Sequence, residues 1–134
     1  MTSAFESEKR EFVRIRVALP VRYKFLSRDP AFAPNSDEIH EGSTNNISGG
    51  GLLLKARIPD LQWLAPLLME RIVLGLNIQL PHDEIPVKAL TRVAWIEAVE
   101  EGTQKGLLGL RFKEIGQEDQ DRILQYIIRC QMPG

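Results

Sequence analysis

The stretch VRIRVALPVRYKF, residues 13–25, carries a large apolar side chain at every odd position. Four of the six positions between them are basic: Arg14, Arg16, Arg22 and Lys24. A period of two predicts a β-strand with one buried face and one basic, solvated face. Pro20 predicts that this strand lies at a sheet edge or contains a bulge, because proline has no N–H to donate to a neighbouring strand.

The same period recurs along most of the remaining chain, and it predicts five more short strands. Their ranges are 43–47, 52–57, 72–80, 86–97 and 106–115. Three successive glycines at 49–51 predict a turn or bulge after the first of these, and Gly102 predicts a hairpin turn before the last. The polar residues 26–42 are expected to form a long loop, and the proline-interrupted residues 58–70 a connector with one helical turn.

The C-terminal residues change to a helical period. Ile123, Leu124, Ile127 and Ile128 share one face at helical spacing, which predicts an amphipathic helix over roughly 117–131. Six short strands followed by one helix predict a mainly β fold. We expect a small six-stranded antiparallel β-barrel with the C-terminal α-helix packed on it.

Composition limits the class of protein. The chain has 134 residues, of which 43% are hydrophobic and 26% charged, as expected for one globular domain. It lacks an apolar run of roughly 18 residues that would cross a bilayer, and residues 1–12 lack the apolar centre of a secretory signal. We therefore expect a cytoplasmic protein without membrane insertion, either a monomer or a homodimer. The single cysteine, Cys130, excludes an intramolecular disulfide and is expected in the core.

Charge is unevenly distributed along the chain. Residues 1–28 hold seven basic and three acidic side chains, a net of +4, so the other residues carry −5 of the total of −1. A basic beginning on an acidic body predicts a local anion site rather than a broad nucleic-acid surface. The sequence pI of about 6.1 agrees, because duplex-binding domains are strongly basic.

Two short patterns suggest a binding site. The first is Arg10-x-x-x-Arg14, directly before the first predicted strand, and the second is Asn46-x-Ser48-x-x-Gly51, at a predicted strand turn. Each pattern alone is weak, because paired arginines are common on solvated faces and Asn-x-Ser is ordinary turn chemistry. Their combination, in this order, is more specific.

In this combination the chain resembles the PilZ family, bacterial receptors for cyclic diguanylate (c-di-GMP). The hallmark of that family is R-x-x-x-R, a first strand, and then (D/N)-x-S-x-x-G. The likeness extends through Leu19-Pro20-Val21, Val93-Ala94-Trp95-Ile96 and Gly109-Leu110-Arg111-Phe112 to the C-terminal helix. It covers about residues 8–130, and the 26–42 loop and the 58–70 segment look like insertions outside the signature.

The resemblance assigns c-di-GMP-binding roles to the signature residues. Arg10 and Arg14 present planar forks that match phosphate oxygens or a guanine edge. Asn46 is suited to bond a guanine edge, and Ser48 to bond a phosphate or brace the turn. Gly51 permits either a close backbone approach or a positive φ.

Two further candidates flank the signature. Trp95 is a stacking surface for a base, with packing on the barrel as the alternative. Lys9 occupies the position at which the family tunes ligand stoichiometry, where arginine favours a stacked ligand pair. Lysine supplies charge but no plane, so we expect a second c-di-GMP to bind more weakly than the first.

The resemblance implies a non-enzymatic receptor or adaptor. Residues 1–12 are expected to form a flexible basic leader, ordered by c-di-GMP against the domain at 13–134. An unidentified protein effector would control motility, attachment, exopolysaccharide or virulence. Two alternatives remain: a PilZ-fold interaction protein of the pilus-assembly type that binds no ligand, and a small barrel that binds single-stranded nucleic acid. We expect no cofactor, no metal site and no catalytic role for His40 or His82, both in predicted loops.

Overall fold

The computed structural model describes residues 13–27, 29–30 and 38–132 of the chain. Within these residues, seven strands are followed by a C-terminal helix, and a short helical segment interrupts them. The strands are β1 (Arg14–Arg16), β2 (Pro20–Ser27), β3 (His40–Ser48), β4 (Gly51–Arg57), β5 (Ile72–Ile78), β6 (Val87–Glu97) and β7 (Lys105–Ile115). The helical segments are η2 (Leu61–Trp63), α2 (Leu64–Leu68) and α3 (Gln117–Gln131).

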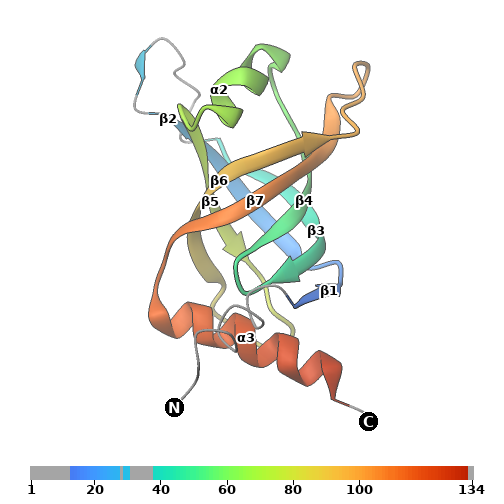
Figure 1. Cartoon of the computed structure of the whole chain (residues 1–134), viewed down its shortest axis with the longest axis vertical. Helices are drawn as coiled ribbons and strands as arrows, with labels where there is room; N and C mark the ends of the chain where they lie inside the picture. Colours follow the sequence, from blue (N-terminus) through green and yellow to red (C-terminus); the bar gives the residue numbers. More distant parts are fainter. Residues whose placement is uncertain (1–12, 28, 31–37, 133–134) are drawn as a thin grey trace.

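Strands β2 to β7 form a closed barrel of antiparallel pairs (Figure 1). The order around the barrel is β3-β2-β5-β6-β7-β4, and the pairing of β3 with β4 closes it. The short β1 lies outside the barrel and pairs with β3. Closure leaves the six strands without a free edge. The expected fold, a six-stranded antiparallel barrel with a C-terminal helix, is confirmed.

The first strand is not continuous, contrary to the expectation for residues 13–25. It splits into β1 and β2, which both pair with β3, and residues 17–19 between them leave the ladder. Thr44 links this segment to β3: its buried hydroxyl accepts from the Leu19 N–H at 2.9 Å and donates to the Val17 carbonyl, and its N–H donates to the Leu19 carbonyl at 3.0 Å. Pro20 begins β2, a position that tolerates the absence of an N–H.

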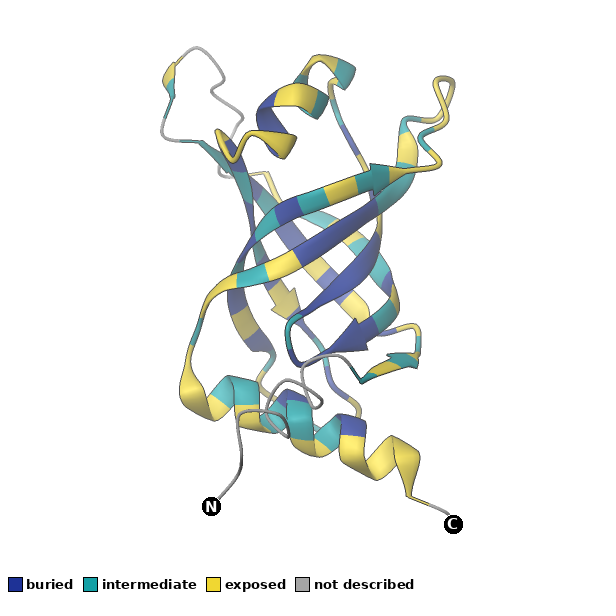
Figure 2. Cartoon of the chain, viewed as in Figure 1, coloured by how far each residue is buried: buried dark blue, intermediate teal, exposed yellow. Residues whose placement is uncertain are grey.

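The core fills the inside of the barrel (Figure 2). Tyr23 and Phe25 are each 1% exposed and meet edge to face with ring centroids 5.7 Å apart. The Tyr23 hydroxyl donates to the Arg57 carbonyl and accepts from the Arg57 N–H, so the buried phenol is satisfied. His40 stacks on Tyr23 at 5.2 Å and begins β3, so the expectation that it lies in a loop is wrong.

Helix α3 covers one end of the barrel, opposite the end where α2 lies (Figure 1). Ile123 and Ile127 bury their side chains in the core, as the helical spacing predicts. Cys130 is exposed, so the expectation of a core cysteine is wrong, because the last turn of α3 extends past the buried Ile127. In the described part of the chain, no helix is long and apolar enough to cross a membrane.

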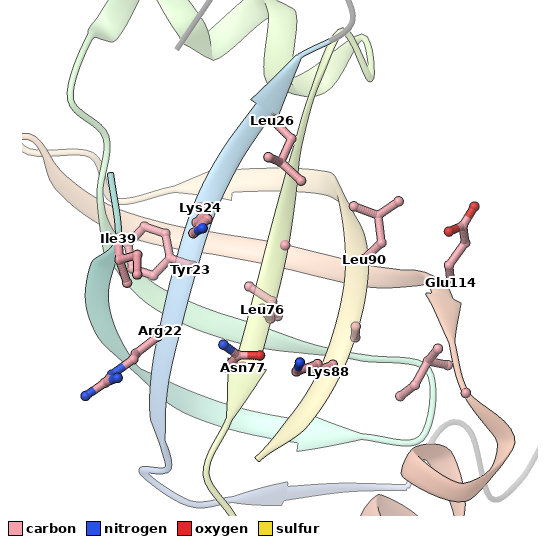
Figure 3. Close-up of a pocket in the computed structure, with 14 residues that line it drawn as sticks. Arg22, Tyr23, Lys24, Leu26, Ile39, Leu76, Asn77, Lys88, Leu90 and Glu114 are labelled. Atoms are coloured by element: carbon pink, nitrogen blue, oxygen red, sulfur yellow. The ribbon is translucent and has the colours of Figure 1, made fainter. Parts of the chain in front are cut away.

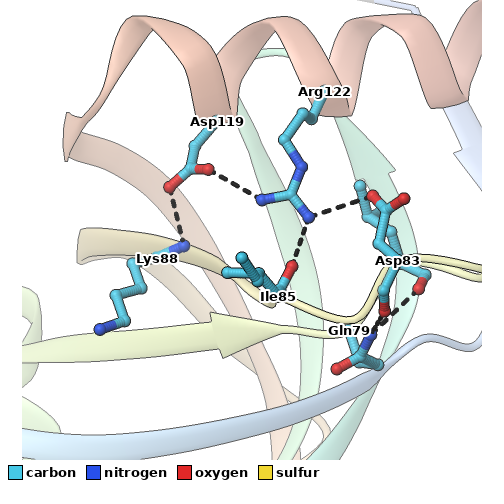
Figure 4. Close-up of polar contacts among 7 residues, drawn as sticks. Gln79, Asp83, Ile85, Lys88, Asp119 and Arg122 are labelled. Carbon is cyan, nitrogen blue, oxygen red and sulfur yellow. Dashed lines mark hydrogen bonds and ion pairs between the residues drawn. The ribbon is translucent and has the colours of Figure 1, made fainter.

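A polar cluster of Asp83, Asp119 and Arg122, which we call the latch, links α3 to the segment between β5 and β6 (Figure 4). The Arg122 guanidinium donates to Asp119 and Asp83, both at 3.0 Å, and to the Ile85 carbonyl. The second oxygen of Asp119 accepts from the Lys88 N–H at 3.2 Å. One arginine therefore links the helix to two residues of the β5–β6 connection, Asp83 and Ile85.

Candidate functional site

Arg14, Asn46 and Trp95 come from three strands and meet on the outside of the barrel. The Arg14 Nη1 donates to Asn46 Oδ1 at 3.0 Å. The guanidinium carbon of Arg14 lies 5.9 Å from the centroid of the Trp95 ring, within the range of a cation–π contact. We call these three side chains the Arg14 cluster.

The pairing register explains why these residues meet. Asn46 of β3 pairs with Leu53 of β4, Leu53 pairs with Gly109 of β7, and Gly109 pairs with Trp95 of β6. Asn46 also pairs with Arg16 of β1 on its other side. One row across the sheet therefore holds both ends of the cluster, and Arg14 reaches into that row from two residues away.

Two bulges turn the cluster outward. The register of β3 against β4 shifts between Thr44 and Asn46, and that of β6 against β7 shifts between Val93 and Trp95. Thr44 and Val93 are buried in the barrel, and strict alternation would send Asn46 and Trp95 inward as well. An extra residue in each strand reverses this, because a bulge re-aims the side chains that follow it.

The indole ring of Trp95 packs against the backbone of Gly109. A Cβ at Gly109 would lie 2.1 Å from two ring atoms of Trp95, so the ring lies directly against the glycine backbone. Leu53, next in the row, is only 6% exposed yet is not part of the core cluster inside the barrel. The indole remains 36% exposed and therefore offers surface to a planar ligand. Trp95 thus packs on the barrel and keeps part of its ring exposed, and its stacking on a base stays a prediction.

The turn that follows Asn46 is braced by Ser48. Its hydroxyl donates to the Gly51 carbonyl at 3.2 Å and accepts from the Gly50 N–H at 3.3 Å. Ser48 is 1% exposed, so of its two expected roles the geometry favours bracing over direct contact with a ligand.

Gly51 is required by a close backbone approach. A Cβ there would lie 1.9 Å from the Leu110 carbonyl oxygen of β7, with which β4 pairs at this point. The glycine does not adopt the left-handed φ that was the other expected reason for it. Its role is to let β4 and β7 meet below the turn.

Two further arginines flank the cluster, and the sequence analysis did not identify them as site residues. Arg16 pairs with Asn46, and Arg111 pairs with Gly51, so both flank the cluster on exposed positions. Within the described residues, neither they nor Arg14 form an ion pair with a carboxylate, which leaves their charge available to an anion. The strand pairing register places Arg16 and Arg111 beside the cluster, and local sequence does not reveal that register. Lys9 and Arg10 lie outside the described residues.

The turn also touches the C-terminal helix. The Gln120 side-chain amide of α3 donates to the Gly49 carbonyl at 3.5 Å. No group of His, Cys, Asp and Glu in the described ranges is arranged to hold a metal ion. Chemically, an exposed guanidinium beside an exposed indole can pair with an anion and stack on a planar group.

Solved structures share this fold. The Bacillus subtilis inhibitor of motility, MotI/DgrA, is 26% identical with a TM-score of 0.62, over 91% of this chain and 51% of that protein. The PilZ domain of CeSA from a cellulose-synthesizing bacterium is 14% identical with a TM-score of 0.53, over 90% and 99%. Borreliella burgdorferi PlzA, solved in complex with c-di-GMP, is 11% identical with a TM-score of 0.55, over 96% and 56%.

The chain thus spans about half the length of MotI/DgrA and of PlzA. No curated protein matches the sequence significantly. The PilZ domain, as a sequence family, matches residues 8–129, which include both signature patterns and every strand of the barrel. The chain therefore belongs to the PilZ domain family.

Proposed function

We propose that this protein is a c-di-GMP receptor that binds its ligand at the Arg14 cluster and relays the signal to a protein effector. The observation that carries the proposal is the placement of Arg14 between Asn46 and the Trp95 ring. A guanidinium held by an amide on one side and an indole on the other has its plane already oriented. Preorganisation of this kind lowers the entropic cost of binding.

The chemistry of the cluster suits the two functional groups of c-di-GMP, its phosphates and its guanines. Arg14 offers a fork for a phosphate or for the O6/N7 edge of guanine. The exposed face of Trp95 suits a base, because aromatic side chains stack on bases of any identity. Arg16 and Arg111 add positive charge on either side, and Lys9 and Arg10 are proposed to add more.

Relatives support the class of ligand. PlzA has the same fold and has been solved with c-di-GMP. MotI/DgrA, the more similar relative at 26% identity, is named as an inhibitor of motility. An output through motility, attachment, exopolysaccharide or virulence is therefore the proposed role of the unidentified effector.

Isothermal titration tests the proposal directly. We expect saturable binding of c-di-GMP and much weaker binding of GTP, GMP and a short single-stranded oligonucleotide. Binding of the oligonucleotide in preference would favour a nucleic-acid barrel, and no binding of any of them would favour a PilZ-fold interaction protein without a ligand. Arg14→Ala should lose c-di-GMP binding, and Arg22→Ala, a basic exposed residue of β2, is the matched control.

The segment before β1 has its own test. We propose that Lys9 and Arg10 close over the ligand, and that a second c-di-GMP binds more weakly than the first. Hydrogen exchange of residues 5–14 should slow when c-di-GMP is added. Equal protection with and without ligand would mean that the segment is ordered beforehand and is no switch.

A further inference from the structure

A surface distinct from the Arg14 cluster lies on the outer face of β2, β5 and β6. It is an open groove of about 590 Å³ (Figure 3). Two rows of paired residues cross it. Lys24, Gly75 and Leu90 form one row, and Arg22, Asn77 and Lys88 form the other. None of these residues belongs to the proposed c-di-GMP site.

Gly75 at the centre of the groove is not required by packing. A Cβ at Gly51 or Gly109 would collide with its neighbours at 1.9 and 2.1 Å, whereas a Cβ at Gly75 would meet only the Leu26 side chain at 3.4 Å, an ordinary contact. A glycine in the middle of a strand weakens that strand, and it commonly marks a place where a ligand approaches the backbone. Gly75 therefore leaves a notch whose walls are the half-buried Leu26 and Leu90.

The groove is positive at one end. Arg22 and Lys88 lie on either side of the exposed Asn77, one strand away on each side. Lys24 and Lys88 form no ion pair through their side chains within the described residues, and Arg22 has a loose one with Glu41, at 3.7 Å between two exposed side chains. The acidic Glu114 of β7 lies beyond Leu90, on the far side of the notch (Figure 3).

We propose that this groove docks an extended acidic segment of a protein partner, with an acidic residue over Asn77 and a large apolar residue over Gly75. Asn77 and Gly75 are two residues apart on β5, so their sites are about 6.6 Å apart. An extended peptide presents residues i and i+2 on one face at the same spacing. The groove thus fits an acidic-x-apolar pattern, with its carboxylate between Arg22 and Lys88 and its apolar side chain against Leu26 and Leu90.

The inference develops the adaptor half of the proposed function and does not depend on c-di-GMP binding. Its test is an amide chemical-shift titration of the full chain with the peptide acetyl-Ser-Glu-Glu-Ser-Leu-Ser-Gly-amide. We expect saturable shifts at residues 22–26, 75–77 and 88–90. Peptides with Lys for Glu, or with Ser for Leu, should bind at least about tenfold more weakly.

Two variants separate this surface from the fold and from the nucleotide site. Gly75→Val fills the notch with a residue that strands favour, so we expect unchanged folding and c-di-GMP binding but peptide affinity at least about tenfold lower. Lys88→Glu changes only an exposed charge and should weaken the acidic peptide by a similar factor. Gly102→Ala, at a glycine with nothing within 4 Å, is the control.

Four outcomes would overturn the proposal. They are the absence of shifts with the acidic peptide, equal shifts with the Lys peptide, wild-type peptide affinity in both Gly75→Val and Lys88→Glu, and groove shifts with phosphatidylglycerol vesicles but not with peptide. Shifts in the groove that depend on protein concentration alone would instead identify a second copy of the chain as its occupant. If the wild-type protein does not bind c-di-GMP, only the proposed nucleotide site is refuted, and the peptide result still stands.

Discussion

The guanidinium carbon of Arg14 lies 5.9 Å from the centroid of the Trp95 ring, although the two residues are 81 positions apart in the sequence. Each holds the other in place: Arg14 is fixed on its other side by Asn46, and the indole rests on Gly109. A ligand that arrives here meets a charge and an aromatic plane already in position. The contacts within the Arg14 cluster therefore do not require a bound ligand.

Replacing Arg14 should weaken c-di-GMP binding strongly. A charge-assisted hydrogen bond contributes about 1.5–3 kcal/mol, so Arg14→Ala should lower affinity roughly 10- to 150-fold in isothermal titration. Arg14→Lys should recover little, because an ammonium can neither fork to two acceptors nor lie flat on Trp95. Unchanged affinity in a folded Arg14→Ala protein would sink the assignment of the site.

Gly109→Ala tests whether the indole acts through its orientation. The new methyl would occupy the position of the Trp95 ring, which must then swing away from the barrel. Base stacking on an aromatic side chain contributes about 1–3 kcal/mol, so we expect c-di-GMP affinity to fall roughly 5- to 150-fold. In a Trp95→Ala background the same change should have no further effect. An additive loss in the double variant would show that Gly109 acts by another route.

Gly51→Val tests the close approach of β4 to β7. The clash with the Leu110 carbonyl involves backbone, which cannot move without breaking the ladder. We expect the free energy of unfolding to fall by about 2–4 kcal/mol in urea denaturation. Gly102→Ala, in open space, should stay within about 0.5 kcal/mol of wild type. Equal stability of the two variants would contradict the packing argument.

Both tyrosines should titrate late. Burial raises the pKa of Tyr23 above its ordinary value of 10.0, against the opposing effect of Arg57. Burial, then the hydrogen bond to Cys130 and the electrostatic effect of that residue, raises the pKa of Tyr126 to about 12. The stability gained from neutral phenols is complete below pH 10.0 and is lost as pH rises through the folded pKa values. In a pH titration followed by ultraviolet absorbance, tyrosinate should form at higher pH in the folded protein than in the urea-unfolded chain. Coincident titration curves for the two states would refute this.

Arg122→Ala should loosen α3. Partial burial opposes the charge of Arg122, but its bonds to Asp83 and Asp119 outweigh this and raise its pKa, so the latch stays charged. Because the side chain is 25% exposed, we expect the free energy of unfolding to fall by only about 1–2 kcal/mol in urea denaturation. Arg129→Ala, at an exposed position in the last turn of the same helix, should change little. Equal losses in both variants would mean that helix propensity, not the latch, is responsible.

Local pattern was enough to predict much of the architecture. Alternation of apolar residues identified the barrel strands, and the change to helical spacing placed the C-terminal helix, because both periods follow directly from backbone geometry. The same alternation wrongly predicted that the first strand continues through residues 17–19. The interruption depends on the hydroxyl of Thr44, about 25 residues away, which no local pattern reports.

The sequence alone was enough to identify the signature residues, and hence the family, because the signature depends only on residue type and spacing. Which way those residues face was decided by the tertiary structure. Along β6, alternation runs through the buried Val93 and would carry Trp95 into the core. The bulge before Trp95 reverses it, and the bulge before Asn46 does the same on β3. A bulge is a property of two paired strands, because only the partner defines which residue is extra. The Arg14 cluster therefore exists only once β3, β4, β6 and β7 have closed the barrel.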